Sequence, residues 1–176
     1  MSHPPSSLLE QEAPGLFGSL KRSCSSAEEL QILCDSYELS AKHGGKIEHG
    51  FTRKEGVSYN PRPARIGAIL VKHFPLNTLS VVQRGMLACA PKLPERYRTP
   101  LVPIFSPSEK STEEDLSIAA ALSLDDLRHR HLRVDQEEVM YDLKCRAEKI
   151  QSFLKNHDHL NDLYTVLSAA IERYKR

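Results

Sequence analysis

The stretch Glu48–Leu70, EHGFTRKEGVSYNPRPARIGAIL, organises the rest of the chain. Its first half is a basic loop interrupted by glycines. Its second half begins a helix at Pro63, because the fixed φ of proline suits a first helical turn and its missing N–H costs nothing there. Apolar residues then recur at helical spacing from Ile66 onward. The stretch therefore predicts a turn that presents Arg53 and Lys54, followed by an amphipathic helix.

Helical periodicity continues on both sides of this stretch. Serine or threonine followed by acidic residues marks two of the helix starts, and prolines or paired glycines mark several ends. Nothing alternates with a period of two for long enough to predict a sheet. We therefore expect an all-α bundle of about six helices. The expected helices cover residues 26–43, 63–74, 77–90, 111–132, 135–156 and 158–174.

Two segments lie outside these helices. Residues 1–25 are rich in proline, serine and glycine, and we expect a flexible leader there. Residues 91–111 carry five prolines, a density that excludes a regular helix and predicts a long Pro-rich connection. The domain organisation expected from these patterns is the leader followed by a single helical domain over residues 26–176.

Composition narrows the class of protein. Twenty-four Lys and Arg residues stand against 23 Asp and Glu residues, so no strong net charge favours binding to nucleic acid or to an anionic membrane. No apolar run approaches the roughly 20 residues of a membrane span. The N-terminus lacks the basic and apolar regions of a secretory signal. We expect a cytoplasmic protein without a membrane or nucleic-acid partner; the sequence does not fix its oligomeric state.

The four cysteines are Cys24, Cys34, Cys89 and Cys145. They are scattered and form no CxxC pair, so neither a zinc site nor a disulfide framework is indicated. We expect reduced thiols, as is usual in a cytoplasmic protein.

Within Glu48–Leu70, nine residues match a longer pattern without a gap. The pattern is H-x-G-Q-x-R-K-D-G-x-P-Y-x-x-H-P-x-R-V, which belongs to the HD-domain hydrolases of the stringent response, the RelA/SpoT-type alarmone hydrolases. The chain resembles that family over Ala27 to about Leu132, which implies an HD-like helical fold. The matching residues are Gly50, Arg53, Lys54, Glu55, Gly56, Tyr59, Pro63, Arg65 and Ile66.

The family resemblance also implies where metal ligands would lie. In the family a divalent metal is held by the His of the H-P pair, by a His-Asp pair ending a later helix, and by an Asp on a central helix, and it activates water against a phosphate ester. Here Arg62 replaces the first ligand, and Met86-Leu87-Ala88-Cys89 replaces the segment that ends in His-Asp. Asp125 matches the last ligand. His129 replaces an Asn of the family.

One carboxylate cannot hold the metal that this reaction needs. The resemblance therefore implies an HD-like pseudoenzyme with no catalytic residues and no expected cofactor. It would act by binding a phosphorylated nucleotide or a protein partner. The alternative is a divergent phosphohydrolase of nucleotides such as guanosine tetraphosphate, dependent on Mn or another divalent metal.

Two interpretations of the basic residues stay open. In one, a phosphate-bearing ligand binds through the positive charges of Arg53 and Lys54, together with those of Arg62 and Arg65. In the other, which we favour, Arg62 pairs with Asp125 across the former metal position and the loop is solvated. The candidate ligand-binding residues are Arg53, Lys54, Tyr59, Arg62 and His129, beside Asp125 as the residual metal-ligand position.

Two further features have a plainer interpretation than a functional site. Cys89 is expected to be a buried thiol rather than a nucleophile, since no basic partner lies near it in sequence. The segment from His157 to Asp162 is expected to be a polar turn rather than a zinc or nickel site. There is also a third hypothesis of function, besides the binding domain and the hydrolase. In it the chain is a purely structural partner protein, and the Pro-rich residues 91–111 are its interaction loop.

Overall fold

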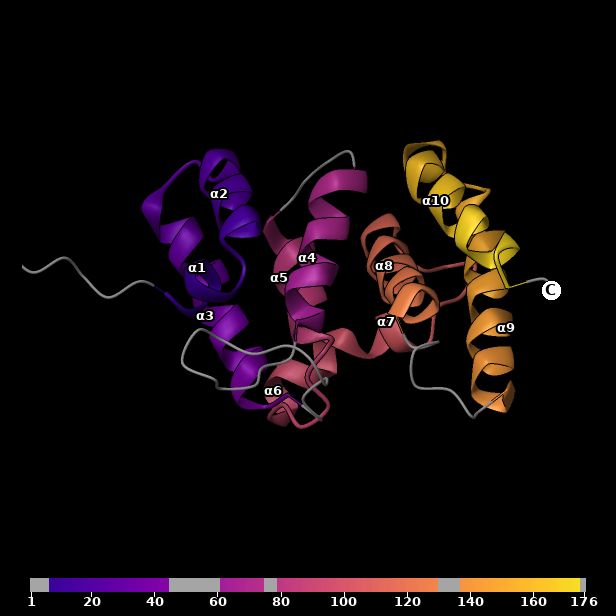
Figure 1. The fold of residues 1–176 in the computed structure, drawn as a ribbon, viewed down its shortest axis with the longest axis horizontal. Helices are drawn as coiled ribbons and strands as arrows, with labels where there is room; N and C mark the ends of the chain where they lie inside the picture. The colour runs from indigo at the N-terminus through magenta and orange to yellow at the C-terminus, as the bar shows by residue number, and fades with distance from the viewer. Residues whose placement is uncertain (1–6, 45–60, 75–78, 130–136, 175–176) are drawn as a thin grey trace, which may run out of the picture.

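The computed structural model of the protein describes residues 7–44, 61–74, 79–129 and 137–174. Within these ranges the regular secondary structure is helical and no strand occurs, so the prediction of an all-α fold is confirmed. Figure 1 shows the helices in their order along the chain. They are α1 (Leu8–Glu12), α2 (Pro14–Ser23), α3 (Ala27–Lys42), α4 (Arg62–His73), α5 (Leu79–Leu87), α6 (Glu95–Arg98), η1 (Thr99–Leu101), α7 (Val102–Phe105), α8 (Glu113–His129), α9 (Glu137–Leu154), η3 (Asp158–Leu160) and α10 (Asn161–Glu172).

Helix α8 lies at the centre of the molecule. Helices α4 and α5 pack against it on one side, and α9 and α10 pack against it on the other. Helices α1 to α3 form the end of the molecule beyond α4 and α5 (Figure 1). Most residues of α8 are buried, as its apolar composition predicts for a central helix.

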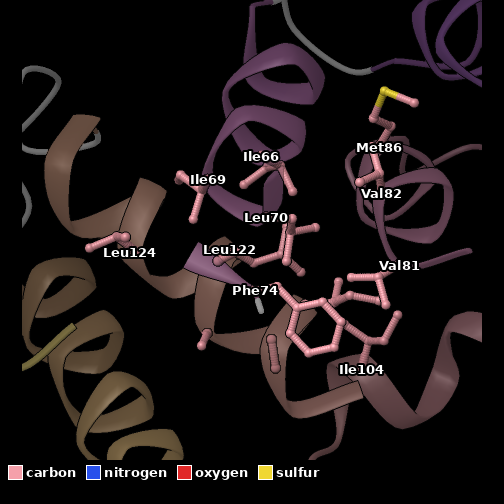
Figure 2. Packing of buried hydrophobic residues seen from close by; sticks show 14 of the residues in the cluster. Ile66, Ile69, Leu70, Phe74, Val81, Val82, Met86, Ile104, Leu122 and Leu124 are labelled. Atoms are coloured by element: carbon pink, nitrogen blue, oxygen red, sulfur yellow. The ribbon is translucent and has the colours of Figure 1, made fainter. Parts of the chain in front are cut away.

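The core between α4, α5 and α8 is aliphatic. Figure 2 shows Ile66 and Leu70 of α4 facing the same interior as Val82 and Met86 of α5. Gly85 lets α4 and α5 approach closely, because a Cβ placed there would lie 2.5 Å from Leu70 Cδ1. This close contact fixes the position of α4, whose first turn carries the basic residues of the candidate site.

Two predicted helix starts are confirmed by their caps. The hydroxyl of Ser26 accepts a hydrogen bond from the backbone N–H of Glu29 at 3.2 Å, which begins α3. Thr112 accepts from the N–H of Asp115 at 3.1 Å and begins α8 in the same way. Helix α4 begins one residue earlier than expected, at Arg62, so Pro63 still lies in its first turn.

The expectation of a flexible leader is wrong for residues 8–23. They form α1 and α2 and contribute fully buried Leu9 and Leu20 to the core. Tyr37 of α3 donates a hydrogen bond to Glu12 at 2.7 Å and so joins α1 to α3. The sparse apolar residues of this segment are enough for docking because nearly all of them face the neighbouring helices.

The expectation that residues 91–111 lack regular helix is also wrong in part. The segment forms α6, η1 and α7 in succession. Pro94 precedes α6, while Pro100 and Pro103 lie in the first turns of η1 and α7, where a missing N–H breaks no helical hydrogen bond. The prolines therefore divide the helix into short turns rather than abolish it.

The C-terminal helices lie close to their expected places. The predicted helix 135–156 corresponds to α9, and the predicted helix 158–174 corresponds to η3 followed by α10. In the part of the chain that the structure describes, no helix has both the length and the apolar character needed to cross a bilayer.

Candidate functional site

The candidate site lies where the start of α4 meets the last turns of α8. Arg62 and Arg65 are three residues apart, so their side chains extend from the same face of α4. Asp125 and Asp126 are adjacent on α8, and Asp125 is only 1% exposed. The helix packing thus brings two arginines to two aspartates that are 60 or more residues away in sequence.

Both carboxylate oxygens of Asp125 are bound by arginine. Arg62 Nη1 donates to Oδ2 at 2.7 Å. Arg65 Nε donates to Oδ1 at 2.7 Å, and its Nη2 donates to Oδ2 at 3.2 Å. This two-point contact is the strong form of an arginine–carboxylate pair. The predicted contact between Arg62 and Asp125 is therefore confirmed, and Arg65 joins it.

Asp126 balances the remaining positive charge. Its Oδ1 lies 2.9 Å from Arg62 Nη1, so Arg62 connects the two aspartates. Burial works against the charge of Arg62, but the neighbouring carboxylates of Asp126 and Asp125 outweigh it and raise its pKa above the ordinary value. The four side chains form a neutral set of ion pairs, which we call the Arg–Asp cluster: Arg62, Arg65, Asp125 and Asp126.

His129 lies at the rim of the Arg–Asp cluster. It follows Asp125 by one helical turn, and its Nε2 lies 3.6 Å from Asp125 Oδ1. That separation is longer than a hydrogen bond. The side chain is 39% exposed, so it faces solvent on one side. It is the residue of the predicted site that is most accessible in the described part of the chain.

Cys89 lies close to the cluster. It is buried, and desolvation raises the pKa of its thiol to about 12 despite the opposing influence of Arg62. Its sulfur lies 3.5 Å from the carbonyl oxygen of Gly85. At neutral pH the thiol is therefore protonated, which supports the interpretation of Cys89 as a buried apolar group rather than a nucleophile.

The structure brings together only part of the predicted set. Arg62, Asp125 and His129 meet, as expected. Arg53, Lys54 and Tyr59, with the rest of the basic loop, lie outside the described residues. The sequence analysis missed the role of Arg65 and Asp126 as members of the ion pairs. The spacing of Arg62 and Arg65 by three residues, and the adjacent aspartates, are the signals that point to them.

Three histidines contact carboxylates on other helices. His157 and His159 lie 3.4 Å from the two carboxylate oxygens of Glu113 on α8. His73 Nδ1 lies 2.7 Å from Asp162 on α10. Among the described residues, no group of three His, Cys, Asp or Glu side chains has an arrangement that could hold a metal ion. These contacts join the turn before α10 to the core of the bundle.

The Arg–Asp cluster can stabilise the fold and can exclude a cation from Asp125. A cation would have to displace two arginines from the same carboxylate. Comparisons of the chain with models of protein families, with curated proteins and with solved structures found no match.

Proposed function

We propose that this chain is a non-hydrolytic, HD-like binding domain in which the Arg–Asp cluster occupies the position of the former metal. The observation that carries the proposal is the engagement of both Asp125 oxygens by Arg62 and Arg65. A divalent metal needs lone pairs on those same oxygens. The cation of this site is thus supplied by the chain itself.

Energetics favour this assignment over the metal-dependent phosphohydrolase. Metal binding would break the charge-assisted hydrogen bonds to Asp125 and leave two largely buried arginines without that partner. Removing one member of a buried ion pair costs about 3–5 kcal/mol. The position of Arg62 adds repulsion, because a guanidinium cannot act as a ligand and stays charged at all physiological pH values.

A protein partner fits the site better than a phosphorylated nucleotide. The charges of Arg62 and Arg65 are balanced by the two aspartates, so an anion would have to compete with carboxylates already in place. Of the described candidate residues, His129 is the most accessible beside them, with its side chain 39% exposed. Nucleotide binding would therefore depend on Arg53, Lys54 and Tyr59 in the basic loop.

The test is a direct measurement of metal binding and turnover. We expect neither stoichiometric Mn²⁺ binding by titration calorimetry nor hydrolysis of guanosine tetraphosphate above the buffer rate. Asp142→Asn, at an exposed position of α9, is the matched control for Asp125→Asn. The proposal would be overturned by stoichiometric Mn²⁺ binding with turnover, if Asp125→Asn abolishes that turnover and Asp142→Asn preserves it. That result would show that the chain is the metal-dependent phosphohydrolase.

The nucleotide alternative has its own experiment. Guanosine tetraphosphate is titrated without metal into the unaltered chain and into the Arg53→Ala/Lys54→Ala variant. We expect no saturable binding to either. Saturable binding that the double substitution removes would assign the site to a nucleotide instead of a protein.

A further inference from the structure

We draw no further inference here: the strongest candidate, the surface patch on α7 formed by the exposed apolar side chains of Val102 and Phe105, carries no proposal because nothing in the described part of the chain shows what covers it.

Discussion

At the scale of single residues, Asp125 decides the character of the candidate site. A carboxylate on a buried helix face can hold a metal when imidazoles and other carboxylates converge on it. Here two guanidinium groups converge instead, and both oxygens accept hydrogen bonds from them. Asp125 is therefore the anion of an internal salt bridge.

Asp125→Asn should strongly destabilise the protein. The amide keeps the shape but removes the charge, so Arg62 and Arg65 lose their principal shared anion in a largely buried setting. We expect the free energy of unfolding, measured with urea, to fall by about 3 kcal/mol. Asp142→Asn should change it by less than about 0.5 kcal/mol, as is usual for an exposed position. Equal effects of the two substitutions would contradict the role given to the Arg–Asp cluster.

Because of Cys89, the free energy of unfolding should depend on pH in the alkaline range. The pKa of its thiol is raised from 9.0 to about 12, mainly by burial, so the unfolded chain releases this proton first. Its contribution to stability is complete below pH 9.0 and is lost as the pH rises toward about 12. The difference in unfolding free energy between the unaltered chain and Cys89→Ala should therefore shrink over that interval. A difference that stays constant would count against deep burial.

At the scale of elements, the approach of α4 to α5 positions the arginines of the cluster. Gly85 permits that approach, since a methyl group there would meet Leu70 at 2.5 Å and Ile66 at 3.2 Å. Ser40 of α3 donates to the carbonyl oxygen of Met86 at 2.8 Å, so the end of α5 is held from a second side. Any change in the spacing between α4 and α5 would move Arg62 and Arg65 relative to α8.

Gly85→Ala tests that spacing. Overpacking a close contact in a buried core costs about 1–3 kcal/mol, and we expect a loss of about 2 kcal/mol in chemical unfolding. Gly15→Ala is the control, because a Cβ at Gly15 has nothing within 4 Å. Alanine favours helix over glycine, so Gly15→Ala should leave the stability unchanged or raise it slightly. A neutral Gly85→Ala would show that the helices can separate without cost.

At the scale of the whole molecule, α8 connects two groups of helices. Arg–Asp pairs join it to α4 and α5, through Asp125 and Asp115. On its other side, Tyr174 donates a hydrogen bond to the carbonyl oxygen of Leu127 in α8. The two helices on that side are joined to each other, because Gln151 of α9 donates to Ser168 of α10. The N-terminal helices α1 and α2 complete the bundle at the far end (Figure 1).

Leu9→Ala tests whether α1 is part of that bundle. Leu9 is fully buried, so truncation should leave a cavity and lower the free energy of unfolding by about 2–5 kcal/mol. Ile32→Ala, at a half-exposed position of α3, should cost much less. The measurement is urea unfolding followed by circular dichroism. A negligible effect of Leu9→Ala would restore the interpretation of residues 8–23 as a loose leader.

By itself, the sequence determined the helical class, the starts of two helices at residues 25–26 and 111–112, and the central place of the helix that contains Asp125. Those features depend on periodicity and on contacts within a few residues, which are local properties of the chain. The pairing of Arg62 with Asp125 was also predicted from the sequence.

Only the tertiary structure decided the features that depend on distant residues. Local proline content predicted a connection without regular helix at residues 91–111, but burial of Ile104 and hydrogen bonds from Arg84 and Arg146 hold it in short helical turns. Arg65 also reaches Asp125 only because α4 crosses α8 at their contact. The physical reason is that burial and ion pairing depend on which helices meet, and local sequence pattern does not specify that meeting.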